Sequence, residues 1–479
     1  MKRRAVLFSL VSAIAILKGS PISAQSSDLG GFVGSWSGIL SIGSNTLRLR
    51  LEIGADSAVS LFSLDQGGAA IPGRLANITG GEISLQFAAI GAGFVGTKTG
   101  NKIVGMFRQG RNDLPLTFLR GADAGFQNQR AAVAPLTQDM LNELRSRAQS
   151  PALIAAAQSR TSPSISMVSG FRSARADTPA TVNDKWHLGS ITKSMTAVVT
   201  ARLIERGLLN WDTKIVDVLG QIAPNMRAEY RDATVLHLLS HQSGLPGNLP
   251  IPRLLGFHMS AKAVTDDRID YTKLALALPP IGPMGSKFEY SNNGYVVLGT
   301  MLEVLTEKSW EELIVAELFT PLGMASAGFG APGTRSRLDQ PLGHSKSIAG
   351  NRRKPANLGG RDLTDNPAVL GPAGRVHASA ADALTYATAH RDYNPILRIA
   401  SWEQLHKVHF GGEYACGLVK RANGDLWHNG SNTLWYAEIT FNSQTGICAF
   451  ACANDGYLPS AGPEVGSALL GIMAAASGS

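Results

Sequence analysis

Cysteine is scarce in this sequence: among 479 residues only Cys416, Cys448 and Cys452 carry a thiol. Cys448 and Cys452 lie in a segment with the pattern of a single strand, where four residues span about 13 Å, too far for a disulfide. Cys416 could pair with one of them only across neighbouring strands. So few cysteines, odd in number, exclude a disulfide-rich scaffold, and we expect three buried free thiols.

Long apolar runs are also rare. One stands out, Ala5 to Leu17, which follows basic residues 2–4 and precedes a small residue, Ala24. This order is typical of a secretory signal peptide cleaved after about Ala24, and the run is too short to span a membrane. We therefore expect an exported protein, periplasmic or secreted, whose remaining chain has no transmembrane segment.

An excess of one charge is missing once the predicted signal peptide is set aside. The full chain has a net charge of +8, but residues 1–24 hold four basic residues and no acid. The remainder has 40 basic and 36 acidic residues, a net charge of +4. No dense basic patch with interleaved aromatic residues is present, so we expect no nucleic-acid partner.

Two catalytic motifs are missing as well. No Gly-x-Ser-x-Gly occurs, which argues against an ordinary α/β-hydrolase. His237 and His241 have the spacing of a zinc-binding His-Glu-x-x-His, but Leu238 stands where the glutamate is needed. We therefore favour a structural role for His241, holding the loop that follows it, and predict neither a metal nor another cofactor.

Residues 28–121 are rich in glycine and predict about eight short strands. Thr46 to Ile53 alternates strictly between polar and apolar residues, as a half-buried strand does. Similar segments recur near residues 58–64, 74–79, 82–89, 92–98, 102–109 and 114–120. Short strands joined by tight turns favour a small up-and-down barrel, and Gly34-Ser35-Trp36 resembles the Gly-x-Trp of lipocalins. Such a barrel would be a docking or shielding module, or a carrier of a small apolar ligand.

Residues 122–135 have the composition of a linker, and residues 136–479 predict a second, larger domain. A helix is expected near 138–149. Strands are expected near 414–421, 424–429, 434–442 and 446–453, followed by an alanine- and glycine-rich helix. Strands at both ends of a long domain with helices between them indicate an α+β fold, a sheet covered by helices on both faces.

The most informative segment is Ser190-Ile191-Thr192-Lys193, at the start of an apolar helix. Residues three apart lie on one helix face, which brings the amine within reach of the hydroxyl proton. The start of a helix favours an oxyanion, and burial lowers the pKa of a lysine. The pair therefore has the features of an activated nucleophile. The plain alternative is a serine N-cap beside a lysine that reaches to solvent.

Two further segments supply partners for this pair. In Tyr290-Ser291-Asn292 the phenol can relay a proton and the amide can hold a lysine or a substrate carbonyl. His428-Asn429-Gly430-Ser431 joins two predicted strands, where Gly430 lets a substrate backbone approach and the Ser431 N–H can point at an oxyanion.

Taken in order, Ser-x-x-Lys, Tyr-x-Asn and His-x-Gly resemble the serine β-lactamase and penicillin-binding superfamily, most closely its class C-like branch with esterases and D-aminopeptidases. The resemblance covers roughly residues 135–479 and includes Trp186 to Lys193, Leu238 to Pro246 and Gly371 to Gly374.

This resemblance implies roles for the residues of the three motifs. It implies that Ser190 attacks a carbonyl, that Lys193 and Tyr290 share its proton, and that Asn292 orients Lys193 and substrate. The N–H groups of Ser190 and Ser431 would form the oxyanion hole. An acyl-enzyme would follow, with Tyr290 as the base for the deacylating water.

His428 departs from many β-lactamases, which have at that position a lysine that helps to hold a carboxylate. A histidine with an ordinary pKa near 6.5 is mostly neutral at pH 7, so carboxylate recognition weakens. We therefore expect a neutral small-molecule ester, amide or short peptide as substrate, with weak or no β-lactamase activity. The alternatives are a penicillin-type sensor or cell-wall binding protein without turnover, and a ligand-carrying barrel attached to a relic hydrolase.

Overall fold

The structure is a computed structural model that describes residues 29–42, 45–63, 70–109, 112–121, 133–334, 337–346, 352–353, 363–421 and 423–478. The chain divides into two compact units, Met1–Ala132 and Val133–Ser479. The predicted signal peptide lies outside the described residues, as does most of the predicted linker. Within the described ranges, no helix combines the length and the apolar character that crossing a membrane requires.

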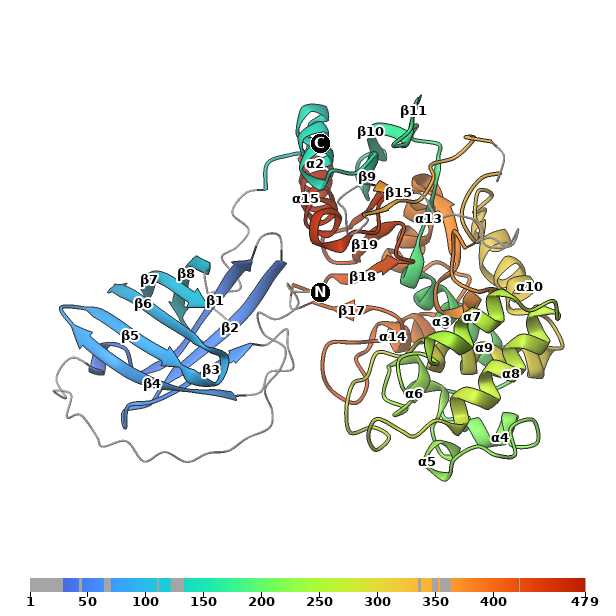
Figure 1. The fold of residues 1–479 in the computed structure, drawn as a ribbon, viewed down its shortest axis with the longest axis horizontal. Coiled ribbons are helices and arrows are strands. Elements are labelled where there is room, and N and C mark those ends of the chain that lie inside the picture. The colour runs from blue at the N-terminus through green and yellow to red at the C-terminus, as the bar shows by residue number, and fades with distance from the viewer. Residues whose placement is uncertain are drawn as a thin grey trace. The chain divides into compact units, whose positions relative to one another are not determined.

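The first unit is a closed barrel of eight antiparallel strands, as predicted (Figure 1). The strands are β1 (Gly34–Ile42), β2 (Asn45–Ile53), β3 (Ala58–Ser63), β4 (Ala70–Thr79), β5 (Glu82–Phe87), β6 (Ala92–Thr99), β7 (Lys102–Gln109) and β8 (Asn112–Arg120). Each strand pairs with the next along the chain, and β1 closes the barrel by pairing with β8, where Trp36 lies opposite Arg120. Short 3-10 turns, Leu29–Gly31 and Ala88–Ile90, accompany the strands.

Large apolar side chains fill the interior of the barrel. Trp36, Phe87, Phe94 and Phe118 are all fully buried, and the rings of Phe94 and Phe118 meet edge to face. The guanidinium of Arg120 lies 4.3 Å from the centre of the Trp36 ring, over its face. Eight strands leave an interior that side chains can fill, and here it forms a hydrophobic core of its own.

The second unit is built on a seven-stranded sheet in the order β11-β10-β9-β20-β19-β18-β17. Its strands are β9 (Ala152–Ser159), β10 (Ile165–Ser173), β11 (Ala176–Pro179), β17 (Val419–Lys420), β18 (Leu426–Ser431), β19 (Tyr436–Asn442) and β20 (Ile447–Ala453). All neighbouring pairs run antiparallel, and β9 lies beside β20 although about 290 residues separate Gln158 from Cys448. The sheet is therefore completed only when both ends of the unit have come together.

Helices cover both faces of this sheet, as predicted. Side chains of β9 alternate: Ala152, Ile154 and Ala156 join the core that contains α3 (Thr192–Glu205), while Leu153 and Ala155 face the other way. Two helices cover that second face, α2 (Gln138–Ala148) and α15 (Leu458–Ser477). The N–H of Leu136, just before α2, donates to the carbonyl of Gly471 in α15 at 2.9 Å.

The remaining helices form the helical region of this unit, in which α13 (Ala380–Arg391) packs on the first face of the sheet, against β9, β19 and β20. The helices of this region are α3 (Thr192–Glu205), α4 (Ile215–Leu219), α5 (Ala228–Arg231), α6 (Val235–Leu239), α7 (Ile251–His258), α8 (Val264–Ala277), α9 (Asn292–Thr306), α10 (Trp310–Ile314), α11 (Thr320–Leu322), α12 (Gly371–Gly374), α13 and α14 (Ile399–His406). Shorter helical turns are η4 (Gly189–Ile191), η5 (Val315–Phe319) and η6 (Ala368–Leu370). A small sheet joins β12 (Lys185–His187), β16 (Val376–Ser379) and β13 (Gly328–Phe329), and β14 (Ser345–Lys346) pairs with β15 (Arg352–Arg353).

The strand predicted at 414–421 is wrong in extent, because only Val419–Lys420 is a strand there. Gly417 has a left-handed φ of +78° and packs so closely on α3 that a Cβ would lie 2.6 Å from the Cα of Ser194. The chain therefore turns at Gly417, and Tyr414 makes a single bridge to Val419. The three cysteines are buried and free, as predicted.

Candidate active site

The turn η4 carries Ser190 and leads directly into α3, whose second residue is Lys193. Gly189, the first residue of η4, has a left-handed φ of +51° that favours glycine. A Cβ at Gly189 would also lie 2.6 Å from the carbonyl carbon of Gly430 in β18. Glycine is thus required twice, by the turn and by the close approach of the two segments.

Lys193 is fully buried, and its amine has three neighbours. Nζ lies 3.1 Å from Ser190 Oγ, 2.7 Å from Asn292 Oδ1 and 2.6 Å from the carbonyl oxygen of Ala373. Burial holds the pKa of Lys193 well below its ordinary value, because the charged form has lost its water.

These contacts match the needs of a neutral amine. Asn292 Oδ1 and the Ala373 carbonyl can only accept hydrogen bonds, so they take the two N–H groups of a neutral lysine. The lone pair is left for the third neighbour, the hydroxyl of Ser190. The arrangement can therefore draw the proton from the serine, which is what a nucleophile of this type requires.

Tyr290 lies over the same amine, with Lys193 Nζ 4.8 Å from the centre of its ring. Burial raises the pKa of Tyr290, and a hydrogen bond with Ser190 opposes that rise only in part. The phenol is consequently protonated at neutral pH and can donate a proton beside Ser190. Asn292 begins α9, a helix capped by Ser291, whose hydroxyl accepts the N–H of Gly294 at 3.0 Å.

Gly430 and Ser431 end β18 next to η4. A Cβ at Gly430 would overlap the carbonyl oxygen of Leu188 and lie 2.7 Å from the Ser190 nitrogen. A Cβ at Gly189 would likewise overlap the Ser431 nitrogen, so the two backbones are in contact at the nitrogens of Ser190 and Ser431. Two backbone donors side by side can stabilise an oxyanion.

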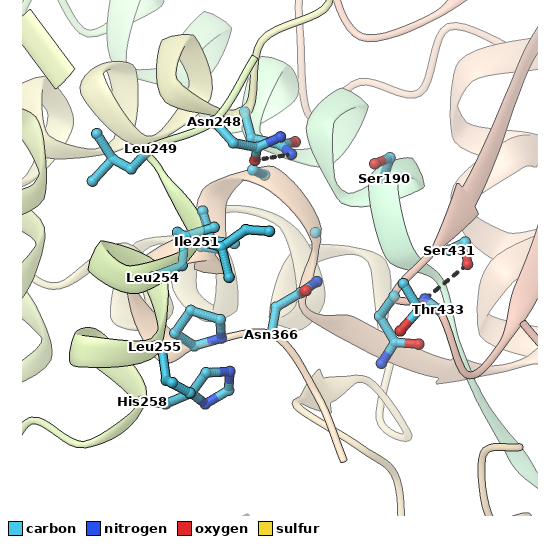
Figure 2. Close-up of a pocket in the computed structure, with 16 residues that line it drawn as sticks. Ser190, Asn248, Leu249, Ile251, Leu254, Leu255, His258, Asn366, Ser431 and Thr433 are labelled. Atoms are coloured by element: carbon cyan, nitrogen blue, oxygen red, sulfur yellow. Dashed lines mark hydrogen bonds between the residues drawn. The ribbon is translucent and has the colours of Figure 1, made fainter. Parts of the chain in front are cut away.

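A cleft of about 500 Å³ opens at Ser190 (Figure 2). Three of the residues predicted from the sequence line it: Ser190, Asn292 and Ser431. The others are Asn248, Leu249, Ile251, Leu254, Leu255, His258, Asn366, Pro367, Leu370, Ala373, Gly374, Asn432 and Thr433. Sequence reasoning singled out Ala373 and Gly374 as part of a glycine loop, and it missed the leucine-rich segment 249–258.

The family model described as Beta-lactamase matches residues 138–468. This chain belongs to the beta-lactamase family of serine hydrolases. The match covers the whole cleft and leaves the barrel outside it.

Individual relatives agree with this membership. Penicillin-binding protein 4 of Amycolatopsis lactamdurans is 31% identical over 215 residues, 44% of this chain and 52% of that protein, so this chain spans about half its length. Among solved structures, the D-amino acid amidase of Ochrobactrum anthropi SV3 has a TM-score of 0.57 at 20% identity, covering 70% of this chain and 97% of that one. EstCE1, a hydrolase with promiscuous acyltransferase activity, has a TM-score of 0.57 at 17% identity, covering 71% and 97%. The two structures establish the shared fold.

In this family member, His428 is buried and bonded on both sides. The Ser291 N–H donates to His241 Nδ1 at 3.0 Å, so the proton of His241 is on Nε2, 3.2 Å from the Tyr414 hydroxyl. That hydroxyl can then donate to His428 Nε2 at 3.0 Å, and His428 Nδ1 donates to the Asn429 carbonyl. Burial and the charge of Lys193 lower the pKa of His428 to about 3, so the ring is neutral at pH 7. His428 is not among the residues that line the cleft.

A buried carboxylate that the sequence did not indicate connects three segments of the site. Asp365 accepts hydrogen bonds from Arg375 Nε at 3.0 Å and from Asn432 Nδ2 at 2.9 Å, and it lies 2.9 Å from His187 Nε2. Burial alone would raise the pKa of Asp365, but these contacts lower it to about 2. The carboxylate therefore holds together the segment before Ser190, the residue after Gly374 and the residue after Ser431. Asp365 belongs to no motif, so no sequence signal pointed to it.

The two histidines with zinc-like spacing have separate surroundings. His237 Nδ1 lies 2.8 Å from the Thr234 hydroxyl, and its ring stacks on Phe410. His241 belongs to the buried chain with Tyr414. Among the described residues, no group of three histidine, cysteine, aspartate or glutamate side chains is arranged to hold a metal ion.

Proposed function

We propose that this protein is an exported serine hydrolase that cleaves neutral ester or amide bonds through an acyl-enzyme on Ser190. The observation that carries the proposal is the buried amine of Lys193, 3.1 Å from Ser190 Oγ, with its two other contacts made to acceptors. Because Lys193 is fully buried, it does not serve as a surface charge. Burying a charged amine is costly, so the neutral form is favoured, and a neutral amine can act as a base.

In the first step, Ser190 Oγ attacks the substrate carbonyl carbon and its proton passes to Lys193 Nζ. The carbonyl oxygen becomes negative between the N–H groups of Ser190 and Ser431. The bond to the leaving group then breaks, and the leaving group takes a proton from Tyr290, which is replenished by Lys193. The products are an ester on Ser190 and a free alcohol or amine.

In the second step, a water molecule attacks the ester carbon. Its proton passes to the Tyr290 and Lys193 pair, and the same oxyanion forms. When the intermediate collapses, Ser190 Oγ regains a proton and the carboxylic acid leaves. Tyr290 acts in this step as a relay to Lys193, because its raised pKa keeps the free phenol protonated at neutral pH.

Neutral substrates follow from the charges of the cleft. Among the described residues that line it, none is an aspartate, glutamate, lysine or arginine. His428, at the position where many β-lactamases have lysine, is neutral and engaged with Tyr414. A substrate carboxylate would find no lysine or arginine among these lining residues, which argues for esters, amides or short peptides over penicillins.

Active-site labelling tests the proposal. We expect a fluorophosphonate to label the wild type and p-nitrophenyl butyrate to be hydrolysed, and we expect Ser190→Ala to lose both properties. Lys193→Ala should lower kcat/KM at least about a hundredfold. The controls are Ser467→Ala, an exposed serine of α15, and Lys273→Ala, an exposed lysine of α8, which should behave like the wild type. Wild-type rates in Ser190→Ala would refute the mechanism.

The similarity to penicillin-binding protein 4 of Amycolatopsis lactamdurans supports a second candidate, a penicillin-type sensor that is acylated without turnover. The two candidates differ in the second chemical step. A sensor would retain a fluorescent penicillin on Ser190 for hours and would release no acid from esters. Rapid ester turnover with no lasting penicillin label would support the hydrolase.

A further inference from the structure

One wall of the cleft is an exposed apolar helix. Ile251, Leu254, Leu255 and His258 of α7 all line the cleft, at the spacing of one face of a helix. Ile251 is 80% exposed and Leu255 46% exposed, and no residue of α7 is fully buried. Apolar side chains that face a cleft beside Ser190, and that the described residues of this unit leave exposed, form a surface for an apolar ligand.

The helix is held in place by Phe257 and Leu254. Phe257 packs against Tyr271 of α8 with ring centres 5.5 Å apart, and Leu254 touches the core of the second unit. Phe257 and Leu254 therefore fix the position of α7, and with it the positions of Leu255 and Ile251. The exposed side chains of Leu255 and Ile251 are not needed to anchor the helix. Their contribution to stability is small, and their position is fixed.

The opposite wall is polar. Figure 2 shows Ile251, Leu254 and Leu255 on one side of the cleft and Ser431 and Thr433 on the other, with Ser190 above and Asn366 between. The Ser431 hydroxyl accepts the Thr433 N–H at 2.9 Å and so belongs to the turn after β18. A carbonyl bound at Ser190 thus has the apolar side chains of α7 on one side and the polar turn after β18 on the other.

We propose that α7 is the acyl-binding wall of this hydrolase and that its substrates carry an apolar acyl group of several carbons; this rests on the function proposed above. The acyl group is assigned to this wall because the leaving group must contact Tyr290, which is not among the residues that line the cleft. The leaving group then departs on the Tyr290 side, and the cleft is free for the acyl chain. Leu255 and Ile251 determine how strongly longer chains are preferred.

Two ester series test the assignment. In the first, p-nitrophenyl acetate, butyrate and hexanoate vary the acyl group; in the second, acetate esters of ethanol, butanol and hexanol vary the alcohol. For the wild type, kcat/KM should rise in the first series by about threefold per added methylene. Leu255→Ser should lower kcat/KM for the hexanoate about tenfold and leave the acetate within about twofold.

Met259→Ser is the matched control, because Met259 directly follows α7, is 46% exposed like Leu255 and does not line the cleft. Its chain-length preference should equal that of the wild type. The inference is overturned if Leu255→Ser lowers acetate and hexanoate equally, if Met259→Ser gives the same shift, or if the shift appears only in the alcohol series. Absence of all turnover with Ser190 unlabelled overturns the proposed function itself, whereas turnover with an unchanged preference overturns only the acyl wall.

Discussion

Gly430 lies against the nucleophile turn so closely that a Cβ there would be 2.7 Å from the backbone nitrogen of Ser190. This contact brings together a strand end and a helix start that lie about 240 residues apart in sequence. The proposed oxyanion hole therefore requires that residue 430 be glycine, because any larger residue would separate the two backbones.

Gly430→Ala tests that dependence. The added methyl group must push β18 away from η4, so the two N–H groups separate. We expect kcat for p-nitrophenyl butyrate to fall about a hundredfold, as when one oxyanion donor is lost. Gly462→Ala in α15, where a Cβ would make only an ordinary contact 3.9 Å from Tyr436, is the control and should keep the wild-type rate. Equal rates in both variants would contradict the assigned oxyanion hole.

The pH dependence of kcat/KM follows from Lys193. The amine must be neutral to accept a proton, and the neutral form accumulates above its pKa, which burial lowers. Activity should therefore rise with pH and reach its plateau well below pH 10.5, the ordinary pKa of lysine. Deprotonation of Tyr290 should not end the plateau below pH 10, because burial raises its pKa. A rise that is complete only near pH 10.5 would contradict the lowered pKa of Lys193.

Asp365→Asn should weaken both stability and turnover. The amide keeps the size of the side chain but places an N–H₂ group among donors from His187, Arg375 and Asn432. We expect the free energy of unfolding at pH 7 to fall by about 1–3 kcal/mol, measured by urea denaturation. Because the folded-state pKa is lowered to about 2, the stabilisation is present above pH 4 and is lost as the pH falls toward 2. Stability that follows the same pH curve in wild type and variant would argue against this role.

Tyr414→Phe removes the hydroxyl between the two buried histidines. His241 Nε2–H then lacks an acceptor and His428 Nε2 lacks a donor, which should cost about 1–3 kcal/mol of stability. Tyr457→Phe, at the start of α15, is the control. Thermal unfolding distinguishes them, and a melting temperature that is the same for both variants would mean that the chain of hydrogen bonds does not form.

Phe94→Ala tests whether the barrel and the hydrolase unit fold separately. Phe94 is buried in the barrel core, and loss of such a ring costs about 3–5 kcal/mol. All residues that line the cleft lie in the second unit. We expect calorimetry to show one transition moved to lower temperature while ester hydrolysis at 25 °C persists. Loss of both together would indicate that the two units are coupled.

The features that the sequence predicted correctly are those set by residues close together in the chain. The alternation of polar and apolar residues from Thr46 to Ile53 predicted a strand of the barrel. The three-residue spacing of Ser190 and Lys193 predicted that the hydroxyl and the amine lie together, because residues three apart are neighbours on one turn of a helix. The motif residues Asn292 and Ser431 also come to the cleft, which the resemblance implied.

What was missed depends on contacts between distant segments. Tyr414 bonds to His241, 173 residues away, and Asp365 bonds to Asn432, 67 residues away. Neither pair has a spacing that periodicity can reveal. The strand predicted at 414–421 was too long for the same reason. The chain turns at Gly417 because α3 packs against it, and the local sequence pattern of a strand does not reveal such a contact.

Leu136 and Gly471 hold the beginning and the end of the hydrolase unit side by side through a 2.9 Å hydrogen bond. The two ends of the unit are therefore close enough in space to be joined. Joining α15 to α2 with a short linker and opening the chain in the exposed turn at 161–164, between β9 and β10, would give a circular permutant with the same neighbours for every strand. The new termini would follow Ser159, at the end of β9 opposite Leu153, whose neighbours in the sheet lead to Ser431, and so offer a place to attach other domains.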